Sequence, residues 1–277
     1  MKPLKSEDLL IRKTPVETDR WATSGDGTGK EVTPIQLERF QALEQTIRNN
    51  PVSAAPYVEL ARIYLLKERW LDAKRVLDRA AELFGKDESV LHLREDAMIA
   101  RSLQLLAHAE TEYRAEPTML TEKELIRAKL DLNAIREKVC RTRLSRHPEQ
   151  LELTIPLAEA LEGLERSDEA IEYLEKAIIQ PGLRAPASLK LGEIYERAGR
   201  VTDALSAYRR AALFRLPPPN ESIKLAALTR AAELALQHRM IDSASRYVAQ
   251  LQELEPNNPR WPQMAQEIVE LAQALLP

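Results

Sequence analysis

The chain has 277 residues, of which 44% are hydrophobic and 5% aromatic, and 40 Lys and Arg side chains nearly balance 43 Asp and Glu side chains. A net charge of −3 excludes a strong attraction of the whole protein to nucleic-acid phosphates or anionic lipid. Ala, Leu, Glu, Lys and Arg supply about half of the residues and Gly is rare, so the composition favours an all-α protein.

The sequence predicts a cytoplasmic protein without a membrane span. Its single cysteine, Cys140, excludes an intrachain disulfide, which fits a reducing compartment. The N-terminus lacks the apolar stretch of a secretory signal. No window approaches the roughly 18 uninterrupted apolar residues that a membrane helix needs.

Residues 1–33 differ from the rest of the chain. Pro, Ser and Gly alternate there with charges of both signs, without helical periodicity, so we expect a flexible tail. Gly25–Lys30 resembles a phosphate-binding loop, but neither Ser nor Thr follows Lys30, and we expect no nucleotide there. Thr33 and Pro34 then form a helix start signal.

A pattern of small and large residues begins in the segment 54–87 and recurs along the chain. Its elements are a pair such as Leu-Ala, a large residue three positions later, and then Ala, a large residue and Ala on the following helix. The best examples, 34 residues apart, are Leu157, Ala158, Leu161, Ala170, Leu174 and Ala177, and Leu191, Gly192, Tyr195, Ala204, Tyr208 and Ala211. Residues three and four apart share a helix face, and alanines allow neighbouring helices to approach closely.

This pattern resembles the signature of the tetratricopeptide repeat family, which ends in a closing Pro. The resemblance covers repeats near 54–87, 151–184, 185–218 and 225–258. It implies a right-handed α-solenoid of helix pairs over residues 34–277, in which the first helix of each pair lines a concave groove. In the family, that groove typically binds a peptide or a helix.

Residues 88–147 break the repeat. Two long helical segments, 88–115 and 120–147, are joined near Pro117. In the second, apolar residues spaced by three and four form a coiled-coil seam that includes Leu132 and Ile135. We therefore expect a long antiparallel hairpin with helices of roughly 40 Å, in which this seam faces the first helix.

The C-terminal segment 262–276 is amphipathic, with Met264, Ile268 and Leu271 on one face, and it is predicted to cap the solenoid. Before it, Pro217–Pro219 lengthens the offset between two repeats. A stiff linker is one interpretation of these prolines, and a docking segment for a proline-binding partner is the other.

The sequence offers little sign of chemistry. None of the four histidines has a partner residue at a metal-ligand spacing. Cys140 lies in a basic stretch, yet no His is placed to act with it. That stretch has no interleaved aromatic residues, so nucleic acid is not the expected partner. We predict no catalytic residue, no cofactor and no metal, and hence not an enzyme.

The repeat register implies a set of charged residues in the groove. They are Arg62, Glu152, Glu159, Glu162, Lys190, Glu193, Glu196, Arg197, Arg230 and Glu233. From the second repeat onward six are acidic and three are basic, which predicts a basic or amphipathic basic ligand, unless these glutamates are only solvated helix surface. Pro156 and Pro186 stand at places where some family members grip a C-terminal carboxylate, so that specificity is not expected.

The sequence thus favours a protein–protein interaction scaffold or adaptor that binds another protein or a peptide. A regulatory module for an enzyme acting in trans and an RNA-binding helical-repeat protein are the alternatives. The partner's identity and the oligomeric state do not follow from the sequence.

Overall fold

A computed structural model of the protein describes residues 34–49, 51–214 and 217–274. Every regular element in these ranges is a helix, as predicted. The chain divides into two compact units, and the boundary falls inside helix α6 (Met119–Arg146), between Val139 and Cys140. The tail expected over residues 1–33 lies outside the described residues.

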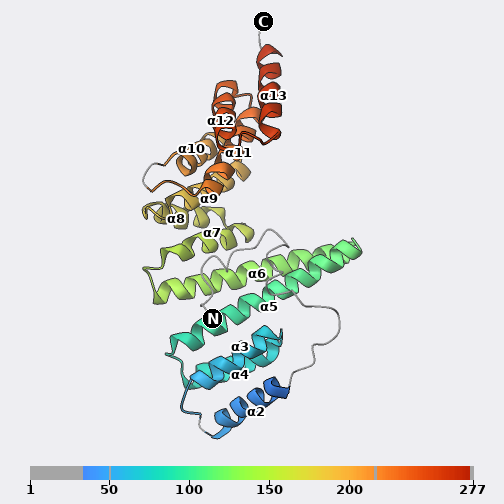
Figure 1. Ribbon diagram of the computed structural model, residues 1–277, viewed down its shortest axis with the longest axis vertical. Helices are drawn as coiled ribbons and strands as arrows, with labels where there is room; N and C mark the ends of the chain where they lie inside the picture. Colours follow the sequence, from blue (N-terminus) through green and yellow to red (C-terminus); the bar gives the residue numbers. More distant parts are fainter. Residues whose placement is uncertain (1–33, 50, 215–216, 275–277) are drawn as a thin grey trace. The chain divides into compact units, whose positions relative to one another are not determined.

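The first unit consists of one helix, a helix pair that packs on it, and two long helices. Its helices are α2 (Pro34–Asn49), α3 (Ala55–Leu66), α4 (Trp70–Leu83), α5 (Glu88–Ala115) and most of α6 (Figure 1). Helix α3 packs against α4 and α2, and α5 packs against both α3 and α4. Repeat positions such as Leu60, Ala73 and Leu77 are buried between these helices, which is what the sequence pattern predicts.

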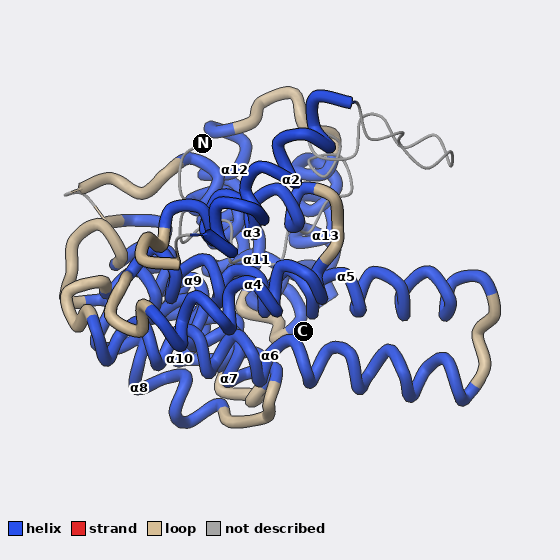
Figure 2. The backbone as a smooth tube through the Cα atoms, turned by 90° about the horizontal axis from the view of Figure 1, so that it is seen from below, coloured by secondary structure: helices blue, strands red, loops and turns tan. Residues whose placement is uncertain are grey.

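Helices α5 and α6 form the predicted long hairpin. Each is an unbroken helix of 28 residues, about 42 Å at 1.5 Å per residue. They run antiparallel on either side of the turn at 116–118, and their distal parts extend beyond α2, α3 and α4 (Figure 2). In the seam, Leu132 is fully buried and Ile135 is half-buried.

The distal part of the hairpin carries large apolar side chains in contact with solvent. The exposed residues there are Leu105, Met119, Leu120, Ile126 and Leu130. They alternate with charged side chains along the same helices. This part of the hairpin therefore contributes little to the core of its unit.

The second unit is a stack of helix pairs. Its helices after the end of α6 are a short 3-10 helix η3 (Leu151–Leu153), α7 (Thr154–Gly163), α8 (Ser167–Ile178), α9 (Arg184–Arg197), α10 (Val201–Leu213), α11 (Glu221–Gln237), α12 (Ile241–Leu254) and α13 (Arg260–Ala274). Each helix from α7 to α13 packs against the next one, and α9 also packs against α7 and α11. The first helices of successive pairs, α7, α9 and α11, are therefore neighbours.

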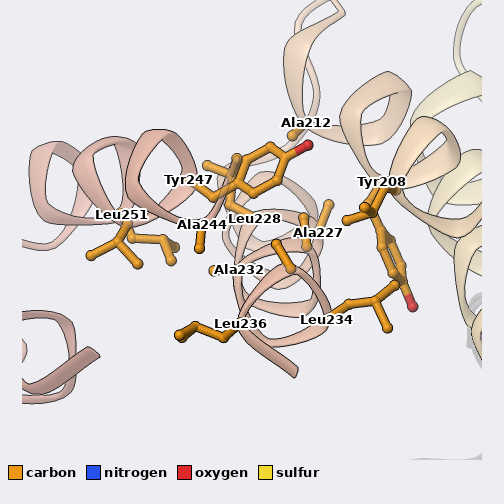
Figure 3. Close-up of a cluster of buried hydrophobic side chains, with 14 of the residues drawn as sticks. Tyr208, Ala212, Ala227, Leu228, Ala232, Leu234, Leu236, Ala244, Tyr247 and Leu251 are labelled. Atoms are coloured by element: carbon orange, nitrogen blue, oxygen red, sulfur yellow. The ribbon is translucent and has the colours of Figure 1, made fainter. Parts of the chain in front are cut away.

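Small residues lie at the helix contacts of this stack. Ala170, Ala204 and Ala244 are fully buried, as their places in the repeat predict. Figure 3 shows the part of the core where Tyr208 of α10, Leu228 of α11 and Leu251 of α12 gather. The alanines leave room for these larger side chains, so the pairs pack closely.

The turn inside each helix pair has the same backbone geometry. One residue takes a left-handed conformation in all four, with φ of 57° at Glu68, 62° at Glu165, 70° at Gly199 and 55° at Arg239. Of the two glycines near these turns, Gly199 occupies the left-handed position and Gly163 is the last residue of α7.

The C-terminal helix α13 caps the stack. Trp261, Met264 and Ile268 are buried and belong to the same cluster as residues of α12. Together with Ala265 they reproduce the spacing of Tyr57, Leu60, Ala61 and Tyr64 on α3. The cap is therefore built like the first helix of a further pair, a register that the sequence analysis missed.

Candidate functional site

The second unit carries nine of the ten predicted groove residues, eight of them on its first helices. Glu152 lies in η3, Glu159 and Glu162 on α7, Lys190, Glu193, Glu196 and Arg197 on α9, and Arg230 and Glu233 on α11. We call these nine residues the α7–α9–α11 face. Arg62, the tenth, lies on α3 of the first unit, where it is exposed.

Lys190 joins α7 to α9 at the centre of the face. Its Nζ lies 2.7 Å from Glu159 Oε1 and 3.0 Å from Glu193 Oε2, and all three side chains are about one-fifth exposed. Burial lowers the pKa of Lys190, but the two carboxylates outweigh it and raise that pKa above its ordinary value. Two acids therefore share one base in this Lys190 cluster, which leaves a net charge of −1.

Glu162 and Arg197 form a second link between α7 and α9. The Arg197 guanidinium contacts Glu162 Oε1, and the Glu162 side chain is only 12% exposed. Burial raises the pKa of Glu162 above its ordinary value, even though Arg197 acts in the opposite direction. This carboxylate is therefore largely withdrawn from a ligand.

Glu196 is engaged by the core. Its carboxylate accepts a hydrogen bond from the hydroxyl of Tyr208. The Tyr208 side chain, on α10, is fully buried. Burial and this hydrogen bond raise the pKa of Tyr208 well above its usual range. The hydroxyl therefore stays protonated and holds Glu196 in place as a hydrogen-bond acceptor.

Two arginines, Arg230 and Arg260, form ion pairs with Glu233 of α11. Arg230 Nη1 lies 3.9 Å from Glu233 Oε2, and Arg260, from the start of α13, contacts Glu233 Oε1. Both arginine side chains are 52% exposed. This Glu233 cluster has two bases and one acid, and hence a net charge of +1. Sequence reasoning missed Arg260; the register of α13 would have indicated it.

The structure shows how the charges of this face are paired. Most of its carboxylates are paired with bases of the same face, and Arg260 adds a positive charge that the sequence register did not include. Glu152 is exposed. With Arg260 the face carries six acids and four bases, a net charge of −2, and its Lys190 and Glu233 clusters have opposite net charges.

Cys140 is unsuited to nucleophilic chemistry in this structure. It is 1% exposed and lies in a hydrophobic cluster with Leu157, Leu161 and Leu174. A thiol packed among apolar side chains acts as a small hydrophobic residue.

The prolines between the second and third pairs of this unit line a hollow. Pro218 and Pro219 border a volume of about 420 Å³ together with Leu213, Phe214 and Leu254. Arg184 stacks on the Phe214 ring, 4.0 Å from its centroid.

Across residues 34–49, 51–214 and 217–274, no helix combines the length and the apolar character that crossing a bilayer requires. The long helices α5 and α6 have the length, but charged residues occur throughout both of them.

Antiparallel helix pairs of one size, with the same turns and the same small residues at their contacts, define the class of helical-repeat proteins. Comparison with protein families gives the particular repeat, because residues 155–221 match the model of the tetratricopeptide repeat. Within residues 155–221 this match agrees with the tetratricopeptide pattern that the sequence predicts.

Several solved structures are similar to this chain at low identity. The tetratricopeptide-repeat protein YrrB, described as having an unusual peptide-binding site, has a TM-score of 0.47 and 16% identity, over 83% of this chain and 99% of its own. The Naa15/Naa10 complex bound to HypK-THB gives 0.42 and 16%, over 83% of this chain and 36% of that one. The APC/C hetero-tetramer Cut9–Hcn1 gives 0.40 and 13%, over 95% and 54%. No curated protein matches the chain.

Proposed function

We propose that the protein is a non-catalytic scaffold or adaptor that binds a peptide or a helix of a partner protein along the α7–α9–α11 face. The observation that carries this proposal is the row of three neighbouring first helices, within the tetratricopeptide repeats, that present charged side chains together. A rigid helix stack orders these side chains before a ligand arrives, which lowers the entropic cost of binding.

The first experiment identifies the partner. The purified full chain is crosslinked in a lysate, and captured proteins are identified by mass spectrometry with and without nuclease treatment. Capture that persists after nuclease supports a protein partner. Capture that disappears with the nucleic acid would contradict the proposal and support the RNA-binding alternative.

The second experiment places the partner on the molecule. Arg230→Glu changes an exposed charge of the face, and Arg246→Glu makes the same change at an exposed position of α12. We expect Arg230→Glu to weaken capture of the partner and Arg246→Glu to leave it unchanged. Equal capture by both variants would exclude this face as the binding surface.

A further inference from the structure

Three glutamates occupy equivalent places on successive first helices, namely Glu159, Glu193 and Glu233. Two of them form an ion pair with a base of the next first helix. Glu159 pairs with Lys190 of α9, and Glu233 pairs with Arg260 of α13. These pairs form a ladder of opposite charges that links neighbouring first helices.

The corresponding ion pair between α9 and α11 is not formed, and we call this position the open rung. No ion pair joins Glu193 of α9 to Arg230 of α11, although α9 and α11 pack against each other. Glu193 instead bonds Lys190 on its own helix, and Arg230 approaches Glu233 on its own helix only to 3.9 Å. The offset between these repeats is longer than the usual 34 residues because of the Pro217–Pro219 insertion.

The open rung separates two clusters of opposite net charge. On the α9 side Glu159 and Glu193 share Lys190, and on the α11 side Arg230 and Arg260 share Glu233. The buried Tyr208 ring lies against Gly192 of α9, the chain neighbour of Glu193, and belongs to the same cluster as Ala231 of α11, the chain neighbour of Arg230. A negative and a positive site are thus held side by side.

We propose that this open rung anchors the ligand, which is a peptide segment carrying a basic side chain and a carboxylate close together. The ligand's ammonium or guanidinium group binds Glu193, and its carboxylate binds Arg230, which is the more exposed of the two partners. Charge-assisted hydrogen bonds of this kind are stronger than neutral ones, and a guanidinium can bind a carboxylate through two of them. This inference rests on the function proposed above and adds a carboxylate to the basic or amphipathic basic ligand that the sequence predicts.

The test uses a phage-displayed library of random 12-residue peptides, selected on the wild-type full chain. Peptides recovered on the wild type are synthesised, and their affinities are measured for the wild type, for Arg230→Gln, and for Arg246→Gln as a control on α12. Circular dichroism verifies that each variant retains its helices. Each peptide is also synthesised with its acidic residue changed to the corresponding amide. The affinities of both peptide versions for the wild type and for Arg230→Gln then form a double-mutant cycle.

We expect the recovered peptides to share a base and an acid at a recurring spacing. We also expect Arg230→Gln to weaken them about tenfold, which corresponds to about 1.4 kcal/mol, and Arg246→Gln to have no effect. The amide version of a peptide should then be insensitive to Arg230→Gln. In a variant with Glu193→Arg and Arg230→Glu together, selection should recover the acid and the base in the opposite order.

Two results would overturn the inference in distinguishable ways. In the first, the recovered peptides compete with each other for the face but lack the charge pair, or they bind Arg230→Gln as well as the wild type. This result would exclude the open rung as the anchor and would leave the proposed peptide-binding function intact. Failure to enrich any peptide above a helical control protein would count against the proposed function and against the inference with it.

Discussion

Gly192 on α9 lies directly against the ring of Tyr208 on α10, so that a Cβ atom added at Gly192 would stand 2.4 Å from Tyr208 Cδ1. The ring has no free space into which it can withdraw, because Tyr208 is fully buried and its hydroxyl is bonded to Glu196. The close approach of these two helices therefore depends on the absence of a side chain at this position.

Gly192→Ala should destabilise the protein by about 1–3 kcal/mol, because protein cores tolerate an added methyl group poorly. Gly182→Ala is the matched control, since nothing lies within 4 Å of a Cβ there. It should be neutral or stabilising by up to about 1 kcal/mol, through the entropy of the unfolded chain. Urea unfolding of both variants measures the difference. Equal stabilities would contradict the contact.

Ala204→Leu should destabilise the protein by about 1–3 kcal/mol through overpacking, because Ala204 is fully buried between helices. Ser206→Leu places the same side chain on the exposed face of the same helix and should change stability by less than about 0.5 kcal/mol. Chemical denaturation compares the two. A negligible effect at Ala204 would show that the repeat register is displaced.

Lys190→Met should destabilise the protein by about 1–3 kcal/mol at neutral pH, because two half-buried carboxylates lose their shared hydrogen-bond donor. The folded-state pKa of Lys190 is raised above 10.5, so its contribution is fully present below that pH. It is lost as the pH rises through the folded-state pKa. Denaturation as a function of pH should therefore show a constant difference between the wild type and the variant from pH 7 to 10.5, which shrinks only as the pH rises through the raised pKa of Lys190.

The exposed variant Arg209→Met provides the comparison for Lys190→Met, since it also exchanges a long basic side chain for Met. It should remain within about 0.5 kcal/mol of the wild type across the same pH range. A difference between the wild type and Lys190→Met that already falls between pH 7 and pH 9 would contradict a raised pKa of Lys190.

Asp87→Ala should destabilise the first unit by about 0.5–2 kcal/mol, because Asp87 caps α5. Its carboxylate accepts hydrogen bonds from the backbone of Ser89, at 2.9 Å, and of Val90, at 3.3 Å. The Ser89 hydroxyl and these amides hold the pKa of Asp87 below its usual 3.8. Its charged-state contribution is thus present above that pH and lost as the pH falls through the lowered pKa. Helix content followed during unfolding at pH 7 and in acid should show the difference shrinking; a constant difference would contradict a charged cap.

Leu132→Ala and Ile126→Ala should separate the packed part of the hairpin from its exposed part. Leu132 is 1% exposed and its truncation should cost about 2–5 kcal/mol. Ile126 is 51% exposed and its truncation should cost less than about 0.5 kcal/mol. Both residues lie on α6 and lose several carbons, so differences in helix propensity between them are small. Similar losses at the two sites, measured by thermal unfolding, would mean that the distal hairpin is packed in solution.

The helices and their register could be predicted from the sequence because the information is local and repeated. Ala170 and Ala204 occupy the same place in a 34-residue period, and both are buried where that period predicts. The unbroken seam through Leu132 likewise predicted one long helix rather than two short ones. A helix depends on residues three and four apart, and such spacings are visible in the chain itself.

Only the tertiary structure decided which charges meet. The sequence placed Glu193 and Arg230 on one face, but whether each pairs across the helices or within its own helix depends on side-chain conformations and on the longer connection at Pro217–Pro219. Arg260 reaches Glu233 because α13 folds back as a further first helix. Ion pairs between helices join residues far apart in the chain and are set by packing geometry, so spacing along the sequence alone does not specify them.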